Sequence, residues 1–161
     1  MDYVIKNMET EAEIKGKAYV HRQSWHEAYA GLVDRGYLDA LTLEKCEAIA
    51  RKWPDNTLVA KQGERVIGFC AYGPCRNDDL PGADEVIAIY VLAPYYGKGV
   101  GAALMRAALD RLQAPQVAVW VLQGNGRAIR FYEKCGFRPD GCAKTITLGT
   151  PLTEVRMILT R

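Results

Sequence analysis

The sequence predicts a single α/β domain in which strands joined as hairpins lie at both ends of the chain. Its 161 residues fit one domain of ordinary size with a sizeable hydrophobic core. Runs rich in β-branched and aromatic residues alternate with stretches of helical periodicity. No repeat, low-complexity tract or linker divides the chain, so we treat residues 1–161 as one domain.

The N-terminal third is predicted to be mostly helical. After a first strand over residues 3–8, apolar and aromatic side chains recur every three or four positions, which predicts an amphipathic helix; these are Ile14, Ala18, His21, Trp25, Tyr29 and Leu32. Two further helical pieces are predicted over residues 36–41 and 42–53. Thr42 has the side chain of an N-cap for the second piece, and Pro54 ends it.

Strands dominate the middle of the chain. Residues 57–73 predict a hairpin around the sequence QGER, and residues 74–84 form a polar loop with two prolines. A long strand over residues 85–93 then leads into a glycine-rich loop and a helix from about Val100 to Leu112. A further buried strand is predicted over residues 116–123.

The C-terminal part is predicted to hold one helix and a hairpin. Asn125 N-caps a helix over residues 126–135, which Gly136 ends as a glycine after a helix commonly does. Two last strands, over residues 145–149 and 154–160, are expected to pair around a turn at residues 150–153.

Composition excludes several classes of protein. The chain is 49% hydrophobic and 25% charged, with a formal net charge of +2, which is too small for a nucleic-acid binder that relies on bulk electrostatics. No stretch approaches the ~18 to 20 apolar residues of a membrane span, and the acidic N-terminus has no apolar signal core. We therefore expect a cytoplasmic protein without nucleic-acid or membrane partners; a homodimer stays open.

The cysteines and histidines argue against disulfides and metal. The five cysteines are odd in number, scattered and without CxxC spacing, which favours a reducing compartment. With only His21 and His26 as imidazole ligands, we expect no zinc site.

Three glycines, at Gly97, Gly99 and Gly101, stand between a predicted strand and a predicted helix. Such a junction exposes backbone N–H groups and a helix N-terminus to a phosphate. A P-loop would need a lysine followed by Ser or Thr after its last glycine, and this loop has neither in place. A dinucleotide fingerprint is formally matched, but Gln123 stands near the place where a carboxylate would hold the ribose. The fingerprint also normally lies in the first strand–helix unit of a domain, whereas this loop lies past the middle of the chain. A nicotinamide-dependent oxidoreductase is therefore an alternative with two unmet requirements.

Residues 85–105 together with residues 125–137 resemble the GNAT superfamily of N-acetyltransferases, which use acetyl-CoA. The family's pyrophosphate motif, Gln or Arg, two residues, Gly, one residue, then Gly or Ala, falls on residues 96–101, with Tyr96 in the Gln/Arg position. Its second signature falls on Asn125, Ala128, Phe131 to Lys134, Gly136 and Phe137. A weaker resemblance extends to residues 21–32 and 154–159, so most of the chain is covered.

The resemblance implies a mixed, mostly antiparallel sheet of about six or seven strands flanked by helices. It also implies transfer of an acetyl group from acetyl-CoA to a primary amine of a small molecule, by direct attack in a ternary complex. The residues it assigns to acetyl-CoA are Ile89, Tyr90 and Val91 for the pantetheine arm, Tyr96, Gly97, Lys98, Gly99, Val100 and Gly101 for the pyrophosphate, and Asn125.

The same resemblance implies two catalytic residues. Tyr132 would act as the general acid that protonates the departing CoA sulfur, since a phenol with a pKa of ~10 stays protonated at neutral pH. Glu85 would be the general base, through a water; otherwise it is a solvent-facing carboxylate at a strand end. His21, Trp25 and Tyr29 would line the acceptor pocket. The alternative from another class is a non-catalytic acyl-CoA-binding module, which would need neither Tyr132 nor Glu85.

Overall fold

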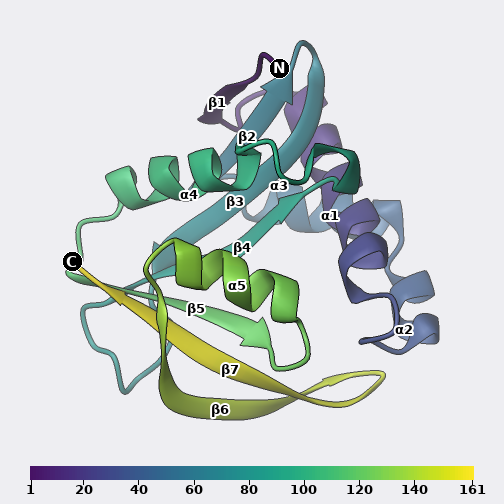
Figure 1. The fold of residues 1–161 in the computed structure, drawn as a ribbon. Helices are drawn as coiled ribbons and strands as arrows, with labels where there is room; N and C mark the ends of the chain where they lie inside the picture. The colour runs from purple at the N-terminus through teal and green to yellow at the C-terminus, as the bar shows by residue number, and fades with distance from the viewer.

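The computed structural model describes residues 1–161, and its centre is one sheet with the strand order β1-β2-β3-β4-β5-β7-β6 (Figure 1). Only β4 and β5 pair in parallel; every other neighbouring pair is antiparallel. The mixed, mostly antiparallel sheet of seven strands confirms the predicted fold class. The strands are β1 (Val4–Asn7), β2 (Thr57–Gln62), β3 (Arg65–Pro74), β4 (Asp84–Val91), β5 (Gln116–Leu122), β6 (Arg138–Leu148) and β7 (Thr150–Thr160).

Helices cover both faces of this sheet. On one face, α1 packs against β3 and α3, and on the other, α4 packs across β2, β3 and β4, with α5 beside it in front of β5 (Figure 1). No helix combines the length and the apolar character that crossing a membrane requires. The helices are α1 (Glu11–Tyr29), α2 (Arg35–Ala40), α3 (Leu43–Lys52), the 3-10 helix η1 (Ala93–Tyr95), α4 (Val100–Arg111) and α5 (Gly126–Lys134).

The hydrophobic core has a main cluster under α4 and a smaller one under α1. Leu104 and Met105 of α4 pack on the main cluster, while Val20 of α1 packs on the smaller one together with Phe69 of β3. The two helices are therefore held firmly on opposite faces of the same strands.

The sheet opens between β4 and β5. Their parallel pairing consists of two pairs, Asp84 with Val117 and Glu85 with Ala118. Beyond Glu85, β4 continues to pair with β3 as far as Val91, and β5 pairs with β7 as far as Leu122. The carboxyl-terminal halves of β4 and β5 thus leave their facing backbone groups unpaired, and a large cavity lies at this opening.

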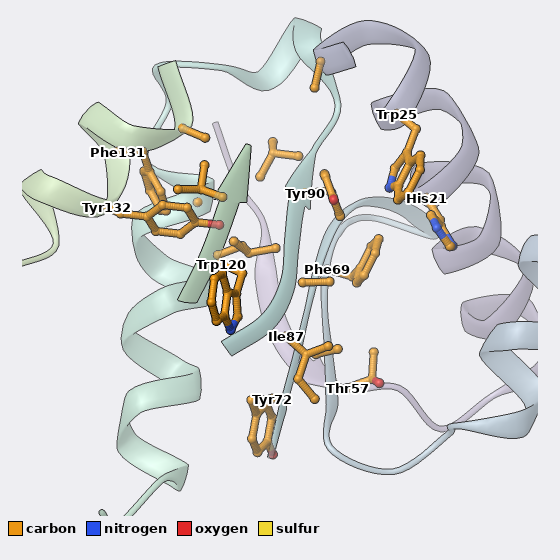
Figure 2. Close-up of a pocket in the computed structure, with 18 of the residues that line it drawn as sticks. His21, Trp25, Thr57, Phe69, Tyr72, Ile87, Tyr90, Trp120, Phe131 and Tyr132 are labelled. Carbon is orange, nitrogen blue, oxygen red and sulfur yellow. The ribbon is translucent and has the colours of Figure 1, made fainter. Parts of the chain in front are cut away.

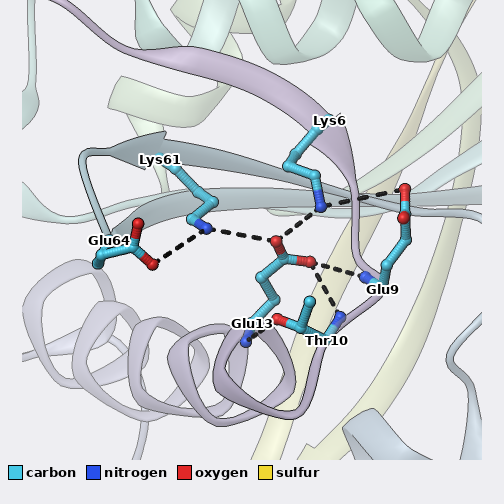
Figure 3. A network of polar contacts seen from close by, with 6 residues as sticks. All are labelled: Lys6, Glu9, Thr10, Glu13, Lys61 and Glu64. Atoms are coloured by element: carbon cyan, nitrogen blue, oxygen red, sulfur yellow. Dashed lines mark hydrogen bonds and ion pairs between the residues drawn. The ribbon is translucent and has the colours of Figure 1, made fainter.

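A buried carboxylate fixes the start of α1 (Figure 3). Thr10 is the N-cap, and Glu13 completes a capping box with it. One oxygen of Glu13 accepts from Lys6 Nζ (2.6 Å) and Lys61 Nζ (3.3 Å), which ties α1 to β1 and β2. Burial acts to raise the pKa of Glu13, but these hydrogen bonds and two from backbone N–H groups outweigh it, and the pKa is about 2.

The C-terminal hairpin differs from its prediction. The turn lies at Gly149, whose φ of +78° suits a glycine, and Thr150 already belongs to β7. On the other side, β6 begins at Arg138, seven residues before the predicted strand. This edge strand is mostly exposed and carries a bulge between Pro139 and Ala143, so it shows no clear alternation of apolar residues.

Candidate active site

A cavity of about 1290 Å³ occupies the opening between β4 and β5. Figure 2 shows Phe131 and Tyr132 of α5 on one side of β4, and His21 and Trp25 of α1 on the other. The cavity therefore joins the two faces of the sheet. Its wall includes Ile89, Tyr90 and Val91 of β4, and Trp120, Val121 and Leu122 of β5.

The glycine loop presents free backbone donors to this cavity. Between Tyr96, whose N–H donates to Ala93, and Ala103, whose N–H donates to Gly99, the backbone N–H groups find no protein acceptor. Gly99 is the N-cap of α4 with a φ of +83° and no side-chain cap. Because consecutive free N–H groups at a helix N-terminus attract anions, the loop is suited to bind a phosphate.

The space over the loop is kept clear of side chains. A Cβ at Gly101 would lie 3.2 Å from the ring of Phe131, so a larger residue at this position would push against that ring. Gly99 and Gly101 line the cavity, whereas Gly97 and Lys98 are exposed beside it and the Val100 side chain is buried in the core under α4.

Arg127 adds a positive charge that the sequence analysis missed. Its guanidinium carbon lies 3.3 Å from the centre of the Tyr96 ring, and both residues line the cavity. Arg127 is the second residue of α5, whose start is fixed by Asn125: the side-chain oxygen of Asn125 accepts from the N–H of Ala128 (3.2 Å). The position of Arg127 two residues after the predicted N-cap Asn125 was the feature of the sequence from which its place near the cofactor could have been inferred. The stacked arginine brings a cation to the position where the family pattern has Gln or Arg and this chain has Tyr96.

Tyr132 faces the cavity with a hydroxyl that makes no hydrogen bond to the protein (Figure 2). Its ring is fixed between Phe131 and Phe137, with ring centres 5.5 and 5.9 Å away. Burial raises the pKa of Tyr132 above its usual range, so the hydroxyl keeps its proton at neutral pH. The residue can therefore donate a hydrogen bond, and then a proton, to a strongly basic atom in the cavity.

Glu85 is buried, and its carboxylate is bound by Arg76. Only 1% of the residue is exposed, so the solvent-facing alternative is wrong. Oε1 accepts from the backbone N–H and from Nε of Arg76 (both 3.2 Å), and Oε2 accepts from Nη2 (2.7 Å). Arg76 lines the cavity and Glu85 does not. Glu85 thus lies next to the site, behind the guanidinium.

Glu154 of β7 is the carboxylate that lines the cavity. It stands opposite Leu122 of β5, and its nearest cation is Lys144, with Nζ 3.8 Å from Oε1. Burial raises the pKa of Glu154, and its charge in turn contributes to the raised pKa values of Tyr29 and Tyr132. The sequence analysis placed residue 154 on a strand but gave no sign that this side chain faces the cavity.

The structure brings the three predicted acceptor residues of α1 together. The rings of His21, Trp25 and Tyr29 follow one another edge to face, 5.6 and 5.1 Å apart. The Tyr29 and Tyr90 hydroxyls are 2.7 Å apart, which joins α1 to β4 across the cavity. All three α1 residues line the cavity, and so does Lys17 one turn earlier.

Known proteins resemble this chain over most of its length. Residues 18–137 match the family model described as acetyltransferase (GNAT) family. The chain is 29% identical over 169 residues to the uncharacterized N-acetyltransferase YuaI of Bacillus subtilis, covering 92% of this chain and 94% of that protein. It is 31% identical over 119 residues to the mycothiol acetyltransferase of Acidimicrobium ferrooxidans, covering 70% of this chain and 37% of that protein.

Solved structures share the fold. The PaiA N-acetyltransferase from Thermoplasma acidophilum, solved in complex with coenzyme A, matches with a TM-score of 0.74 and 20% identity over 100% of both chains. YncA from Salmonella typhimurium, solved with acetyl-CoA, matches with a TM-score of 0.73 and 18% identity over 99% of this chain and 94% of that one.

Proposed function

This chain belongs to the acetyltransferase (GNAT) family, and on that premise we propose that it transfers an acetyl group from acetyl-CoA to a primary amine of a small molecule. The observation that carries the proposal is the continuous cavity. It joins the free N–H groups of the glycine loop to the Tyr132 hydroxyl and to the pocket under α1. Both substrates can therefore meet in one continuous cavity, as direct attack in a ternary complex requires.

The residues at the opening fit acetyl-CoA. The pyrophosphate would accept hydrogen bonds from the N–H groups of the glycine loop, and Arg127 and Lys98 would supply positive charge. The β5-facing backbone of Ile89 to Val91 is free to pair with the amide groups of the pantetheine arm, like an added strand. The structurally similar PaiA and YncA, solved with coenzyme A and acetyl-CoA, support this assignment.

The chemistry forms one C–N bond and breaks one C–S bond. The neutral amine attacks the thioester carbonyl carbon, the carbonyl oxygen gains negative charge, and the C–S bond then breaks to release a thiolate. Backbone N–H groups at the opening stabilise the oxyanion, and Tyr132 gives its proton to the sulfur. The proton lost by the amine is taken by a base, because an amine with a pKa of ~10.4 is neutral in only about one molecule in 2,500 at pH 7.

Two carboxylates compete for the role of base. Glu85 is the one that the resemblance implies, and Arg76 occupies both of its oxygens. Glu154 lines the cavity, and burial raises its pKa, which favours its taking a proton from a bound amine. We favour Glu154 as the base and assign Glu85 to holding the Arg76 guanidinium at the cavity wall.

Amine-dependent release of free thiol tests the proposed function. The protein is incubated with acetyl-CoA and a panel of amines, thiol is followed with a disulfide reagent, and the products are identified by mass spectrometry. We expect thiol release that depends on the amine and yields one N-acetylated product per thiol. Tight binding of acetyl-CoA without any amine-dependent release would instead support the acyl-CoA-binding module.

A further inference from the structure

Lys17 of α1 is a buried lysine without a carboxylate partner. Only 6% of the residue is exposed, it lines the cavity, and it takes part in no ion pair. Its Nζ lies 4.6 Å from the centre of the Phe69 ring, and burial lowers the pKa of Lys17, which Cys46 offsets only in part. Moving an ammonium group out of water costs free energy unless an opposite charge pairs with it. Lys17 has no such partner, so the cost of burying its charge is largely uncompensated.

Glu13, on the same helix, is a buried charged residue whose hydrogen bonds stabilise the fold. One turn earlier, Glu13 accepts hydrogen bonds from Lys6, Lys61 and two backbone N–H groups. Lys17 has no such partners, although it is about as well buried. A structural role therefore explains Glu13 and does not explain Lys17.

Two more unpartnered nitrogen atoms continue the face that Lys17 begins. His21 Nδ1 and Trp25 Nε1 are buried and form no hydrogen bond of normal geometry, and both residues line the cavity; the Trp25 indole nevertheless lies near enough to the Tyr90 hydroxyl to act on the pKa of that tyrosine. Residues 17, 21 and 25 are spaced by four, so they lie on one side of α1 in successive turns. Figure 2 shows the His21 and Trp25 rings on the cavity side of the helix.

The side chains of Lys17, His21 and Trp25 can all donate hydrogen bonds. The lysine ammonium and the indole N–H are donors only. Burial and then the charge of Lys17 lower the pKa of His21 to about 4, so at pH 7 its ring is neutral and offers one N–H. A third buried atom without a partner, Ser24 Oγ, belongs to a residue that does not line the cavity. A ligand that satisfies this face must therefore bring acceptor atoms and negative charge.

We propose that Lys17, His21 and Trp25 bind an anionic group, a carboxylate or a phosphate, that the acceptor amine carries. The inference rests on the proposed function and narrows it: the acceptor is an amino acid or a phosphorylated amine, and a polyamine is disfavoured. The Phe69 ring beside Lys17 packs against the Tyr90 ring of β4, with ring centres 5.7 Å apart, and both rings line the cavity. The anion would lie on the α1 side, with the amine directed past Tyr90 toward the thioester.

Matched pairs of amines test this specificity. Acetyl transfer is measured for L-phenylalanine against phenethylamine and for O-phosphoethanolamine against ethanolamine, with the wild type, Lys17→Met and Lys15→Met. Lys15 is exposed on the same helix and is the matched control. We expect the wild type and the control to prefer the anionic member of at least one pair. Lys17→Met should lower that preference by about 10- to 100-fold, through a raised KM.

The pair that shows the preference identifies the group as carboxylate or phosphate. A wild type that prefers the neutral member of both pairs, or a preference that survives in Lys17→Met, would overturn the proposal.

Thermal unfolding tests the same site without turnover. With coenzyme A saturating the glycine loop, acetate or inorganic phosphate should raise the Tm of the wild type and of Lys15→Met more than that of Lys17→Met. Without added anion, Lys17→Met should unfold about 2 to 4 °C higher than the wild type, because an unpaired buried charge is gone. Equal anion effects in all three proteins, or a lower Tm for Lys17→Met, would contradict the anion site.

The two tests separate the two proposals. If no amine is acetylated but the rise in Tm caused by the anion still depends on Lys17, the proposal of acetyl transfer is wrong and the proposal of an anion site is supported.

Discussion

Arg76 Nη2 lies 2.7 Å from Glu85 Oε2, at the last residue pair that joins β4 to β5. The same arginine also donates to the other oxygen of Glu85 through Nε and its backbone N–H. The strands separate beyond this point, and the pair holds a largely exposed guanidinium among the residues that line the cavity. The position that family resemblance gives to a base is thus occupied by an ion pair.

Glu154→Gln and Glu85→Gln separate the two candidate bases. We expect Glu154→Gln to lower kcat/KM about 100-fold near neutral pH, with a loss that shrinks as pH rises because neutral amine becomes available. Glu85→Gln should keep the shape of the pH–rate profile and lower the free energy of unfolding by about 1 to 3 kcal/mol, since Arg76 loses a charged acceptor. If the pH-dependent loss occurs in Glu85→Gln alone, Glu85 is the base and our assignment of Glu154 is wrong.

Gly99→Asp should remove binding of coenzyme A. The side chain would stand among the free N–H groups of the glycine loop and bring a negative charge against the pyrophosphate. We expect at least a 100-fold rise in Kd by calorimetry. Gly63→Asp is the control, because Gly63 also has a positive φ, of +58°, and lies in the β2–β3 turn. A Gly99→Asp protein with wild-type affinity would show that the phosphates bind elsewhere.

Arg127 and Tyr96 should act as a unit in binding coenzyme A. Arg127→Gln should raise the Kd about tenfold, as expected for loss of a charged contact to phosphate, and the effect should weaken in high salt. Tyr96→Leu should have a smaller effect alone and little further effect in the double variant, because the ring acts by holding Arg127. The control is Arg35→Gln, an arginine with a 92% exposed side chain. Strictly additive effects of the two substitutions would contradict this arrangement.

Glu13→Gln should destabilise the fold in a pH-dependent way. The pKa of Glu13 is about 2 in the folded chain and 4.5 as its ordinary value, so the stabilisation is complete above 4.5 and is lost as pH falls toward 2. At pH 7 we expect a loss of about 2 to 3 kcal/mol in denaturant unfolding. At pH 3 the difference between the variant and the wild type should be clearly smaller. The same difference at both pH values would mean that the carboxylate charge is not what anchors α1.

The fold could be predicted because its signals are local. Gly99 with its positive φ and Asn125 as an N-cap fix two helix starts, and the strand between them, β5, is rich in buried valines. The turn of the C-terminal hairpin was predicted at residues 150–153 and lies at Gly149, because the sequence carries no local signal for it. There, β6 is an exposed edge strand, and polar edge strands lack the alternation from which a register can be inferred.

The site residues that the sequence analysis did not predict reach the cavity through contacts between segments that are far apart in the chain. Arg76 lies in a polar loop, and nothing near it in the sequence shows that it reaches Glu85. Glu154 lines the cavity only because β5 turns away from β4 and carries β7 with it. Lys17 has the same residue type as exposed lysines nearby, and its burial becomes visible only when α1 is packed on Phe69.

Turnover by Tyr132→Phe tests the central claim most directly. The hydroxyl makes no hydrogen bond to the protein and the ring keeps its packing against Phe131 and Phe137, so Tm and affinity for acetyl-CoA should stay unchanged. If the hydroxyl protonates the departing sulfur, kcat for amine-dependent thiol release should fall by about 100- to 10,000-fold, as is typical of general-acid catalysis, and a fall of about tenfold is the smallest that the role allows. The loss should be smaller with an acyl donor whose thiol leaves more readily. A variant that folds, binds acetyl-CoA and turns over at nearly the wild-type rate would contradict the role of Tyr132 as the acid.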